Sequence, residues 1–528
     1  MKLNNFSDNF KSTSAVRLLE LFFIVLLLVV ILYIRLYQLG ADPPVGLSIS
    51  TDVYTDPPQY TLFAKMFCQT GDFNLLNDYR FVFFIKSGVT ALAVVVFKLL
   101  GVSLWSSNFV GLLYSLGALF LFFLFVRKQF GRLAGIFFLV LISSDFNHIF
   151  YGRLPFLEHA MAFYGFLSIV ILCYFPNKMG TILAGVSLAV SIFFSKILGV
   201  IFLFPFFCYF VYSFQYEGRK NKLKTTGMFA IGFTIVTIFW LFYSYLPMKQ
   251  RVSSYIQEQT ISLYGFPEAL ESFSTFIFKL VSFGDRTMLF QRMKIPALLG
   301  TFLLGMILFH LAKGKPWKHR FGMFNSGHIF ITTMIIAFYG SLMIWNYQPL
   351  RYQIILIYPF YGAAAVVLKM LWRKWQNTEL EKVPYLFFLF CYPLVLVPLY
   401  QFYSYYIEST VGGFFFDDYI YSVAIGAFVL TAIIFVIITL FKKNKIPKKP
   451  VLGKILAAII IGLVFQKGYT DYEFWWARPT FTIRDNSIDL GNILSPEAVL
   501  SGPFGSLLTL QNDLPGIIHM FGVSKADP

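Results

Sequence analysis

Thirteen long apolar stretches recur along the chain, and they constrain its fold more than any other feature. Each is about 20 residues long, which is what a helix needs to cross the hydrocarbon core of a membrane. Apolar residues make up 57% of the 528 positions and charged residues 13%, which is more apolar surface than a water-soluble core can hide. The sequence therefore predicts an all-α polytopic membrane protein with spans near residues 16–38, 108–126, 133–150, 158–175, 180–197, 199–215, 226–246, 296–312, 326–345, 352–371, 384–404, 419–441 and 451–468.

The charge of the connectors sets the expected topology. Five connectors rich in Lys and Arg fall on one side of the membrane, and less basic segments fall on the other. Because short cytoplasmic loops are rich in Lys and Arg, we expect the N-terminus inside and the C-terminal tail outside. The basic connectors are residues 127–132, 219–224, 313–320, 373–374 and 442–449, and the outer segments are 39–107, 247–295, 405–417 and the tail from 469.

Residues 84–104 are also apolar enough to span the membrane. Counting them as a span would move all five basic connectors to the outside. It would also place Lys98 inside the bilayer, which costs a few kcal/mol. We therefore expect residues 84–104 to form a helix on the outer membrane surface.

Several function classes are excluded by what the sequence contains. The net charge is +17, but the basic residues lie in short clusters between spans, so no nucleic-acid partner is expected. The chain has neither a GxxxxGK[ST] loop nor a GxGxxG fingerprint, which argues against a nucleotide cofactor and an ATP-driven pump. The first apolar stretch has no small-residue cleavage site after it and is expected to remain as a span. Neither a disulfide framework nor a zinc site is expected from the four cysteines, Cys68, Cys173, Cys208 and Cys391.

The tail differs from the rest of the chain in its sequence pattern. Residues 486–494 have a helical pattern, and residues 498–500 and 516–520 resemble short strands. The sequence thus predicts two parts, a membrane domain over 1–468 and a small outer α/β tail over 469–528.

Polar residues gather at the predicted outer ends of the spans. Carboxylates beside several cations at one membrane face suit a site that holds a lipid phosphate while it activates an acceptor hydroxyl. The candidates are Asp52, Asp56, Lys86, Arg153, Glu158, His159, Lys196, Arg351 and Tyr352.

Each candidate also has a structural interpretation. Lys86 and Lys196 could extend from apolar helices to the membrane surface. Arg153 and Glu158 could form an ion pair across the entrance of a helix. Asp56 precedes two prolines and could cap the helix that follows them, which would not exclude a catalytic role.

Residues 56–72 resemble the first outer loop of the GT-C membrane glycosyltransferases. That family includes the protein O-mannosyltransferases and the transferase that adds aminoarabinose to lipid A. The shared pattern is an acid, a tyrosine a few residues later (here Tyr60), a short helix and Gly-Asp, although Pro57 stands where the family has a second acid. Further matches follow in the family's order at Lys86, Glu158, Ser195-Lys196 and Arg351-Tyr352.

The resemblance implies a GT-C helix bundle and a function. The function is inverting transfer of a sugar from a polyprenyl-phosphate donor to a lipid, glycan or protein acceptor at the outer face of the cytoplasmic membrane. Asp56 is then the general base or positions the acceptor, and Glu158 is a second acid. The donor-phosphate ligands are then Lys86, Lys196 and Arg351. No metal ligands stand out, and the need for a divalent metal stays open.

Two other functions are open at this point. A transporter or flippase of lipid-linked sugars would need polar groups near the middle of the membrane and a repeat of helices, and the sequence has no clear repeat. A catalytically degenerate subunit of an envelope-assembly complex fits the loss of the second acid at Pro57.

Overall fold

The computed structural model describes residues 14–44, 52–73, 87–213, 219–247, 292–312, 325–345, 349–374 and 450–517, with a few single positions between them. Regular structure in these residues is helical except for two strands of two residues each. The helices are α1 Ser14–Leu36, α2 Asp52–Thr70, α4 Gly88–Leu100, α5 Leu104–Phe130, α6 Arg132–Ser143, α7 Phe146–Tyr151, α8 Leu157–Tyr174, α9 Lys178–Phe193, η1 Ile197–Phe202, α10 Leu203–Ser213, α11 Arg219–Trp240, η3 Leu241–Tyr245, α15 Lys294–Ala312, α17 Ser326–Ile344, α18 Leu350–Gln353, η5 Ile354–Leu356, α19 Ile357–Lys374, α22 Pro450–Ala477, α23 Thr482–Ile493 and α24 Gly505–Leu508.

Helices occupy every predicted span that the structure describes. Seven helical stretches are long and apolar enough to cross a membrane, so the chain is a multi-pass membrane protein, and shorter apolar helices fill the other described spans. The predicted spans 384–404 and 419–441 lie outside the described residues, so the total of thirteen remains a prediction. The span predicted over 133–150 is two helices, because Asp145 caps α7 by accepting a hydrogen bond from the His148 amide at 2.6 Å.

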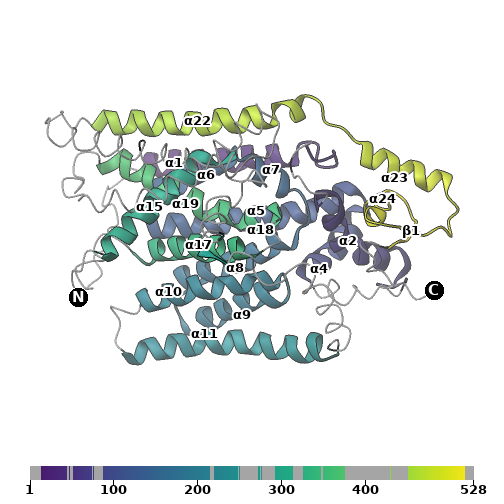
Figure 1. Cartoon of the computed structure of the whole chain (residues 1–528), viewed down its shortest axis with the longest axis horizontal. Coiled ribbons are helices and arrows are strands. Elements are labelled where there is room, and N and C mark those ends of the chain that lie inside the picture. Colours follow the sequence, from purple (N-terminus) through teal and green to yellow (C-terminus); the bar gives the residue numbers. More distant parts are fainter. Residues whose placement is uncertain are drawn as a thin grey trace.

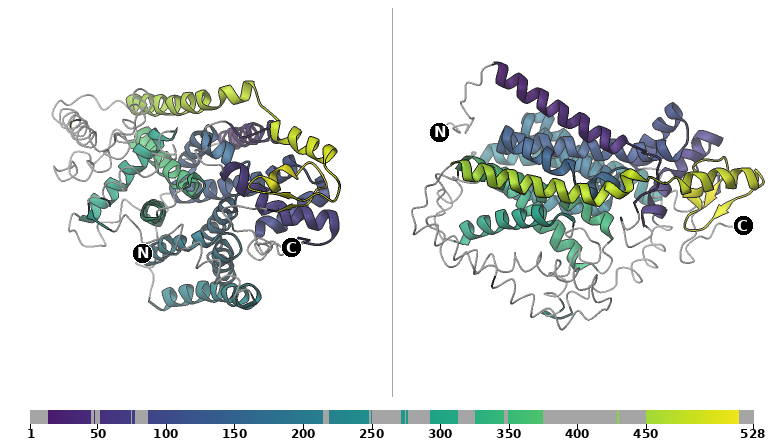
Figure 2. Two further views of the ribbon diagram at one scale, coloured as in Figure 1. Left: turned by 45° about the vertical axis from the view of Figure 1, so that its right-hand side comes forward. Right: turned by 90° about the horizontal axis from the view of Figure 1, so that it is seen from above.

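The helices form an elongated bundle, with the helices of the first outer segment and of the tail at one end. In Figure 1, α11 and α22 run along opposite edges of the bundle, and α2, α4, α23 and α24 gather at the right-hand end. Both views of Figure 2 keep α23 beside the helices of the first outer segment.

Residues 84–104 contain the helix α4. With 13 residues it is about 20 Å long, shorter than the roughly 30 Å hydrocarbon core. It packs on α2, where the Thr90 hydroxyl donates to the Tyr60 carbonyl at 3.2 Å, and on α5, where the Tyr114 hydroxyl donates to the Gly88 carbonyl at 2.9 Å. The location of residues 84–104 on the outer membrane surface stays a prediction.

Cysteine labelling tests the topology. In a chain whose own cysteines are replaced, Asn486→Cys on α23 should react with a membrane-impermeant maleimide added outside, because the tail is expected there. Lys128→Cys, exposed near the end of α5, should stay unlabelled. Outside labelling at position 128 would mean that residues 84–104 do cross the membrane.

The core brings the site-bearing connectors close together. The connector between α7 and α8 runs so near α5 that a Cβ on Gly111 would lie 2.2 Å from the Leu154 carbonyl oxygen. A side chain at position 111 would displace this connector, so the glycine is what lets the two segments approach. Glu158 follows at the first turn of α8 and is thereby fixed against α5.

The tail contains a helix and two short strands near their predicted places: α23 begins four residues earlier than predicted, and β1 shares only Leu500 with the predicted strand over 498–500. After α23, β1 (Leu500–Ser501) pairs in parallel with β2 (Gly516–Ile517), with Leu500 opposite Gly516. In the sequence α24 comes between the two strands, and in the structure it contacts α2. The tail is thus packed against the first outer segment.

Candidate active site

Two carboxylates share one face of the first turns of α2. The helix begins at Asp52 rather than after Asp56, so Asp56 lies within the helix and the interpretation of Asp56 as an N-cap is wrong. Residues four apart on a helix lie one above the other, which places Asp52 and Asp56 side by side. Pro57 and Pro58 lie in the second turn of the helix and have no N–H to donate to the carbonyls four residues earlier. The carboxylate pair is therefore spaced by four residues and does not need an acid at position 57.

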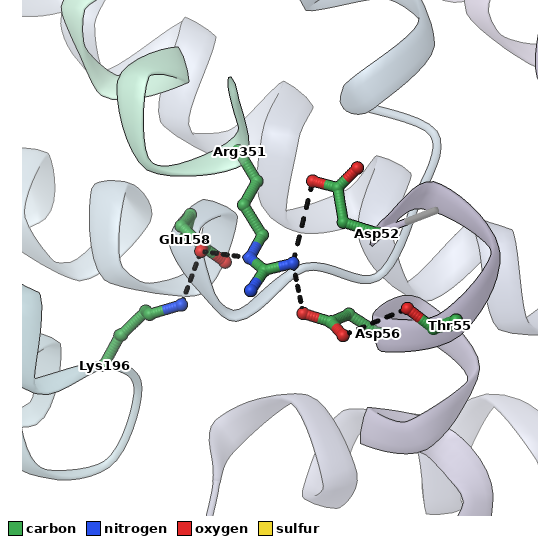
Figure 3. Close-up of polar contacts among 6 residues, drawn as sticks. All are labelled: Asp52, Thr55, Asp56, Glu158, Lys196 and Arg351. Atoms are coloured by element: carbon green, nitrogen blue, oxygen red, sulfur yellow. Dashed lines mark hydrogen bonds and ion pairs between the residues drawn. The ribbon is translucent and has the colours of Figure 1, made fainter. Parts of the chain in front are cut away.

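Arg351 is the centre of the site. It lies in α18, which starts after the extended residue Pro349. Its Nη1 contacts Asp56 Oδ2 and is 3.6 Å from Asp52 Oδ2, while its Nε is 3.8 Å from Glu158 Oε1 (Figure 3). One guanidinium thus joins carboxylates from α2 and α8.

Lys196 completes the cluster from the break between α9 and η1. Its Nζ is 2.5 Å from Glu158 Oε1, and it lies over the Tyr352 ring at 4.0 Å from the ring centroid. The Arg351 guanidinium lies over the same ring, at 5.1 Å. Tyr352 therefore holds both cations by cation–π contacts and keeps them in the same small volume.

The three carboxylates differ in their access to solvent. The side chains of Asp52 and Glu158 are 3% and 2% exposed, whereas that of Asp56 is 16% exposed. The Thr55 hydroxyl donates to the second Asp56 oxygen at 3.3 Å. Asp56 is consequently the carboxylate that an incoming group can reach.

Burial changes the acid–base properties of the site. It raises the pKa of Asp56, with smaller increases from Glu158 and Asp52, against the opposing effects of Arg351 and Lys196. Three carboxylates face two cations, so the cluster has an excess of negative charge that a protonated Asp56 would remove.

The remaining predicted residues divide into those near the cluster and those directed elsewhere. Tyr60 lies one turn after Asp56 and is buried. Burial raises the pKa of its hydroxyl, and the nearby Asp56 charge raises it further. His159 is turned to the backbone, with Nε2 at 2.8 Å from the Tyr151 carbonyl oxygen. Lys86 lies outside the described residues.

Arg153 is not part of the cluster. It donates to the Gln38 carbonyl and stacks over the Trp475 ring at 4.7 Å. Gln38 has a φ of +48°, which is unusual for a residue with a side chain, and the contact with Arg153 helps to hold that turn at the end of α1. The ion pair considered between Arg153 and Glu158 is replaced by the pairs of Glu158 with Lys196 and Arg351.

A second buried polar network was missed from the sequence. Arg35 Nη2 lies 2.9 Å from His148 Nδ1, and His148 Nε2 lies 3.1 Å from the Tyr358 hydroxyl. Because a guanidinium only donates, His148 accepts at Nδ1 and carries its proton on Nε2. Nearby, the Tyr361 hydroxyl donates to Asp145 at 2.7 Å. These residues join α1, α7 and α19. The sequence feature that could have indicated this network is the charge of Arg35 near the end of the first predicted span.

Among the described residues, no group of three or more His, Cys, Asp or Glu side chains is arranged to hold a metal ion.

Comparisons with known proteins address the fold. No protein-family model and no curated protein matches the sequence. The structure is similar to that of ArnT from Cupriavidus metallidurans bound to undecaprenyl phosphate, with a TM-score of 0.55 and 14% identity over 94% of this chain and 85% of that one. For ArnT in the apo state the TM-score is 0.52, with 14% identity over 96% and 86% of the two chains. The chain therefore has the fold of the GT-C membrane glycosyltransferases, as its first outer segment predicted.

Proposed function

We propose that the protein is a membrane glycosyltransferase that moves a sugar from a polyprenyl-phosphate donor to a hydroxyl of a lipid, glycan or protein acceptor. The observation that carries this proposal is that the guanidinium of Arg351 lies within ion-pair distance of three carboxylates, those of Asp52, Asp56 and Glu158. A transferase that releases a lipid phosphate needs cations for that phosphate and a carboxylate for the acceptor proton in one place. The GT-C fold supports this assignment over an unrelated membrane enzyme.

The reaction is a single displacement. Asp56 takes the proton of the acceptor hydroxyl, whose oxygen forms a bond to the anomeric carbon. The bond between that carbon and the phosphate oxygen breaks, and the polyprenyl phosphate leaves with the electron pair. One displacement inverts the configuration at the anomeric carbon.

Arg351 and Lys196 are the proposed ligands of the leaving phosphate. The guanidinium can offer two parallel N–H donors to two phosphate oxygens, and Lys196 adds a second charge. Both lie on Tyr352 and are largely buried, so their attraction to the developing negative charge is only weakly screened. Lys86 stays a further proposed phosphate ligand on the resemblance alone.

The donor phosphate and Asp56 compete for the same guanidinium. Arg351 Nη1 contacts Asp56 in this structure, and this contact lowers the basicity of the carboxylate. A phosphate that takes Arg351 removes the opposing cation and brings a negative charge, and both effects raise the pKa of Asp56. Donor binding would thus turn Asp56 into a better base when a sugar is ready for transfer.

The paired carboxylates also bear on the alternative of a degenerate subunit. That alternative rested on Pro57 in place of a second acid. Asp52 supplies a second carboxylate one helical turn before Asp56, within 3.6 Å of the same guanidinium. This second carboxylate favours an active enzyme over a degenerate subunit.

The location of the reaction follows from the predicted topology. We place the site at the extracytoplasmic face of the cytoplasmic membrane, within a catalytic domain over residues 1–468, with the tail over 469–528 on the same side. A lipid-linked donor suits this face, since no nucleotide fingerprint is present in the sequence.

An assay of donor turnover tests the proposed function. Purified protein in proteoliposomes is given a panel of undecaprenyl-phosphate-linked hexoses and pentoses with an envelope extract as acceptor. We expect release of undecaprenyl phosphate that requires the extract, and mass spectrometry of the extract should identify the glycosylated product. Movement of the intact donor across the bilayer without release of undecaprenyl phosphate would identify a transporter instead, and neither outcome with any donor would refute both.

A further inference from the structure

The tail packs against the face of α2 opposite to the carboxylates. Asp56 and Lys65 are nine positions apart, and at about 100° of rotation per residue they lie on opposite faces of the helix. Asp56 faces Arg351, whereas Lys65 faces the tail. Figure 1 shows α24 beside α2 at the same end of the bundle. α2 is therefore held between the site and the tail.

Lys65 is the main polar contact between the two segments. Its side chain is buried, and Nζ donates to the Thr509 carbonyl at 2.5 Å and to the Leu514 carbonyl at 2.7 Å. Burial lowers the pKa of this amine to about 7, with Asp513 opposing the change. A lysine is seldom buried without a specific partner, because its charge is costly to remove from water. Two carbonyls directed at one amine specify how the tail sits on α2.

Apolar and exposed contacts add to this interface. Leu507 and Leu510 of the tail pack with Leu104 in a small separate core. At the exposed edge, the Gln69 amide donates to Asp513 at 2.9 Å. The docked tail is thus a packed interface with a buried polar centre.

The tail also holds the segment that leads into α2. The Asp42 carboxylate accepts hydrogen bonds from the Thr482 amide at 2.8 Å and the Ile483 amide at 3.1 Å, at the start of α23. These amides have no helical partners of their own, so the carboxylate caps α23 and fixes residues just after α1 to it. The tail is therefore attached on both sides of the connection to Asp52.

We propose that the tail is a structural part of the catalytic unit, and that Lys65 is a positioning residue which holds Asp52 and Asp56 against Arg351 through the tail. This inference rests on the proposed transferase function. Lys65 touches neither the donor nor the acceptor. Its effect passes through the placement of α2, because a shift of about 1 Å at a reacting group can cost about a hundredfold in rate.

Two variants disturb the interface from opposite sides. Lys65→Met removes the amine but keeps an unbranched side chain of similar length, and Leu510→Ala removes apolar packing from the tail. Each is expected to increase hydrogen exchange of the amides over residues 505–517 by at least about tenfold and to lower turnover of the undecaprenyl-phosphate sugar by about tenfold. The affinity for undecaprenyl phosphate alone should change less than about threefold, because Arg351 and Lys196 lie on other elements.

The double variant and a matched control decide between mechanisms. If both residues act through tail docking, Lys65→Met with Leu510→Ala should lower turnover little more than either change alone. Two changes that disturb the same docking interaction do not have additive effects. Gln69→Ala removes the exposed contact between the same segments and should leave exchange and turnover nearly unchanged.

Three results would contradict the proposal. Unchanged exchange over residues 505–517 in Lys65→Met would show that the amine does not hold the tail. Increased exchange with wild-type turnover would show that the tail does not position α2. Additive losses of turnover would give Lys65 a role of its own in the site. The exchange measurements need no substrate, so tail docking is tested even if the protein transfers no sugar.

Discussion

Asp56→Asn is expected to lower turnover of the lipid-linked donor by at least about 100-fold, the lower end of the range for loss of a general base. The amide has the same shape as the carboxylate and still accepts a hydrogen bond from Arg351, so the protein should fold and insert normally. It cannot take the acceptor proton. Single-turnover rates of undecaprenyl phosphate release, measured on purified protein with saturating donor, give the effect directly.

Asp52→Asn is the matched control for this variant. It removes a carboxylate from the same helix face and the same guanidinium, but from a side chain that is only 3% exposed. We expect a loss of less than about tenfold, because Asp52 positions Arg351 without reaching the acceptor. If Asp52→Asn were as damaging as Asp56→Asn, or if Asp56→Asn kept most of the activity, the base would have to be sought at Asp52 or Glu158.

Arg351→Ala is expected to have the second large effect, a loss of about 100- to 1000-fold in turnover, comparable to removing one donor that stabilises a developing negative charge. Arg351→Lys should retain part of the activity, because a point charge replaces the bidentate fork. Leaving-group charge grows in the transition state, so the loss should appear in turnover as well as in donor affinity. Donor and acceptor kinetics measured separately should show the donor affected and the acceptor little changed.

The pH profile separates Arg351 from a merely structural residue. Burial raises the pKa of Asp56, so the wild-type activity should rise with pH at values above the usual pKa of about 4 for an aspartate. Arg351 lowers that pKa, so its removal raises the pKa further and the base form appears only at higher pH. The rising limb of the pH–activity profile of Arg351→Ala should therefore lie at higher pH than that of the wild-type protein. An unmoved limb, or unchanged donor kinetics in Arg351→Lys, would remove Arg351 from the site.

Much of the candidate site could be predicted because its residues occupy special places along the chain. Glu158, Lys196 and Arg351 each stand at the end of an apolar stretch, and the predicted topology put all three at the same membrane face. Asp56 was found through the resemblance of its segment to one family. The sequence nevertheless put the start of the following helix too late, because two prolines usually mark a helix start and here lie within its second turn.

Other features depended on contacts that no local pattern contains. Arg153 has the same position at a span end as Glu158, yet it turns to Gln38 and Trp475. The role of Lys65 could not be predicted from its local sequence, because its partners Thr509 and Leu514 lie in the tail, far along the chain. The spacing of Asp52 and Asp56 became a carboxylate pair only when the helix was found to begin at Asp52.

By itself the sequence determined that this is a helical membrane protein, which described stretches are apolar helices, and which residues stand at the ends of those stretches. These are local properties, since the length of an apolar stretch and the cost of a charge in lipid need no knowledge of distant residues. Only the tertiary structure decided that Arg351 joins three carboxylates, that Lys196 pairs with Glu158, and that the tail is fixed to α2. Those pairings depend on which helices pack together, and packing is set by side-chain shape and close approach across the whole bundle.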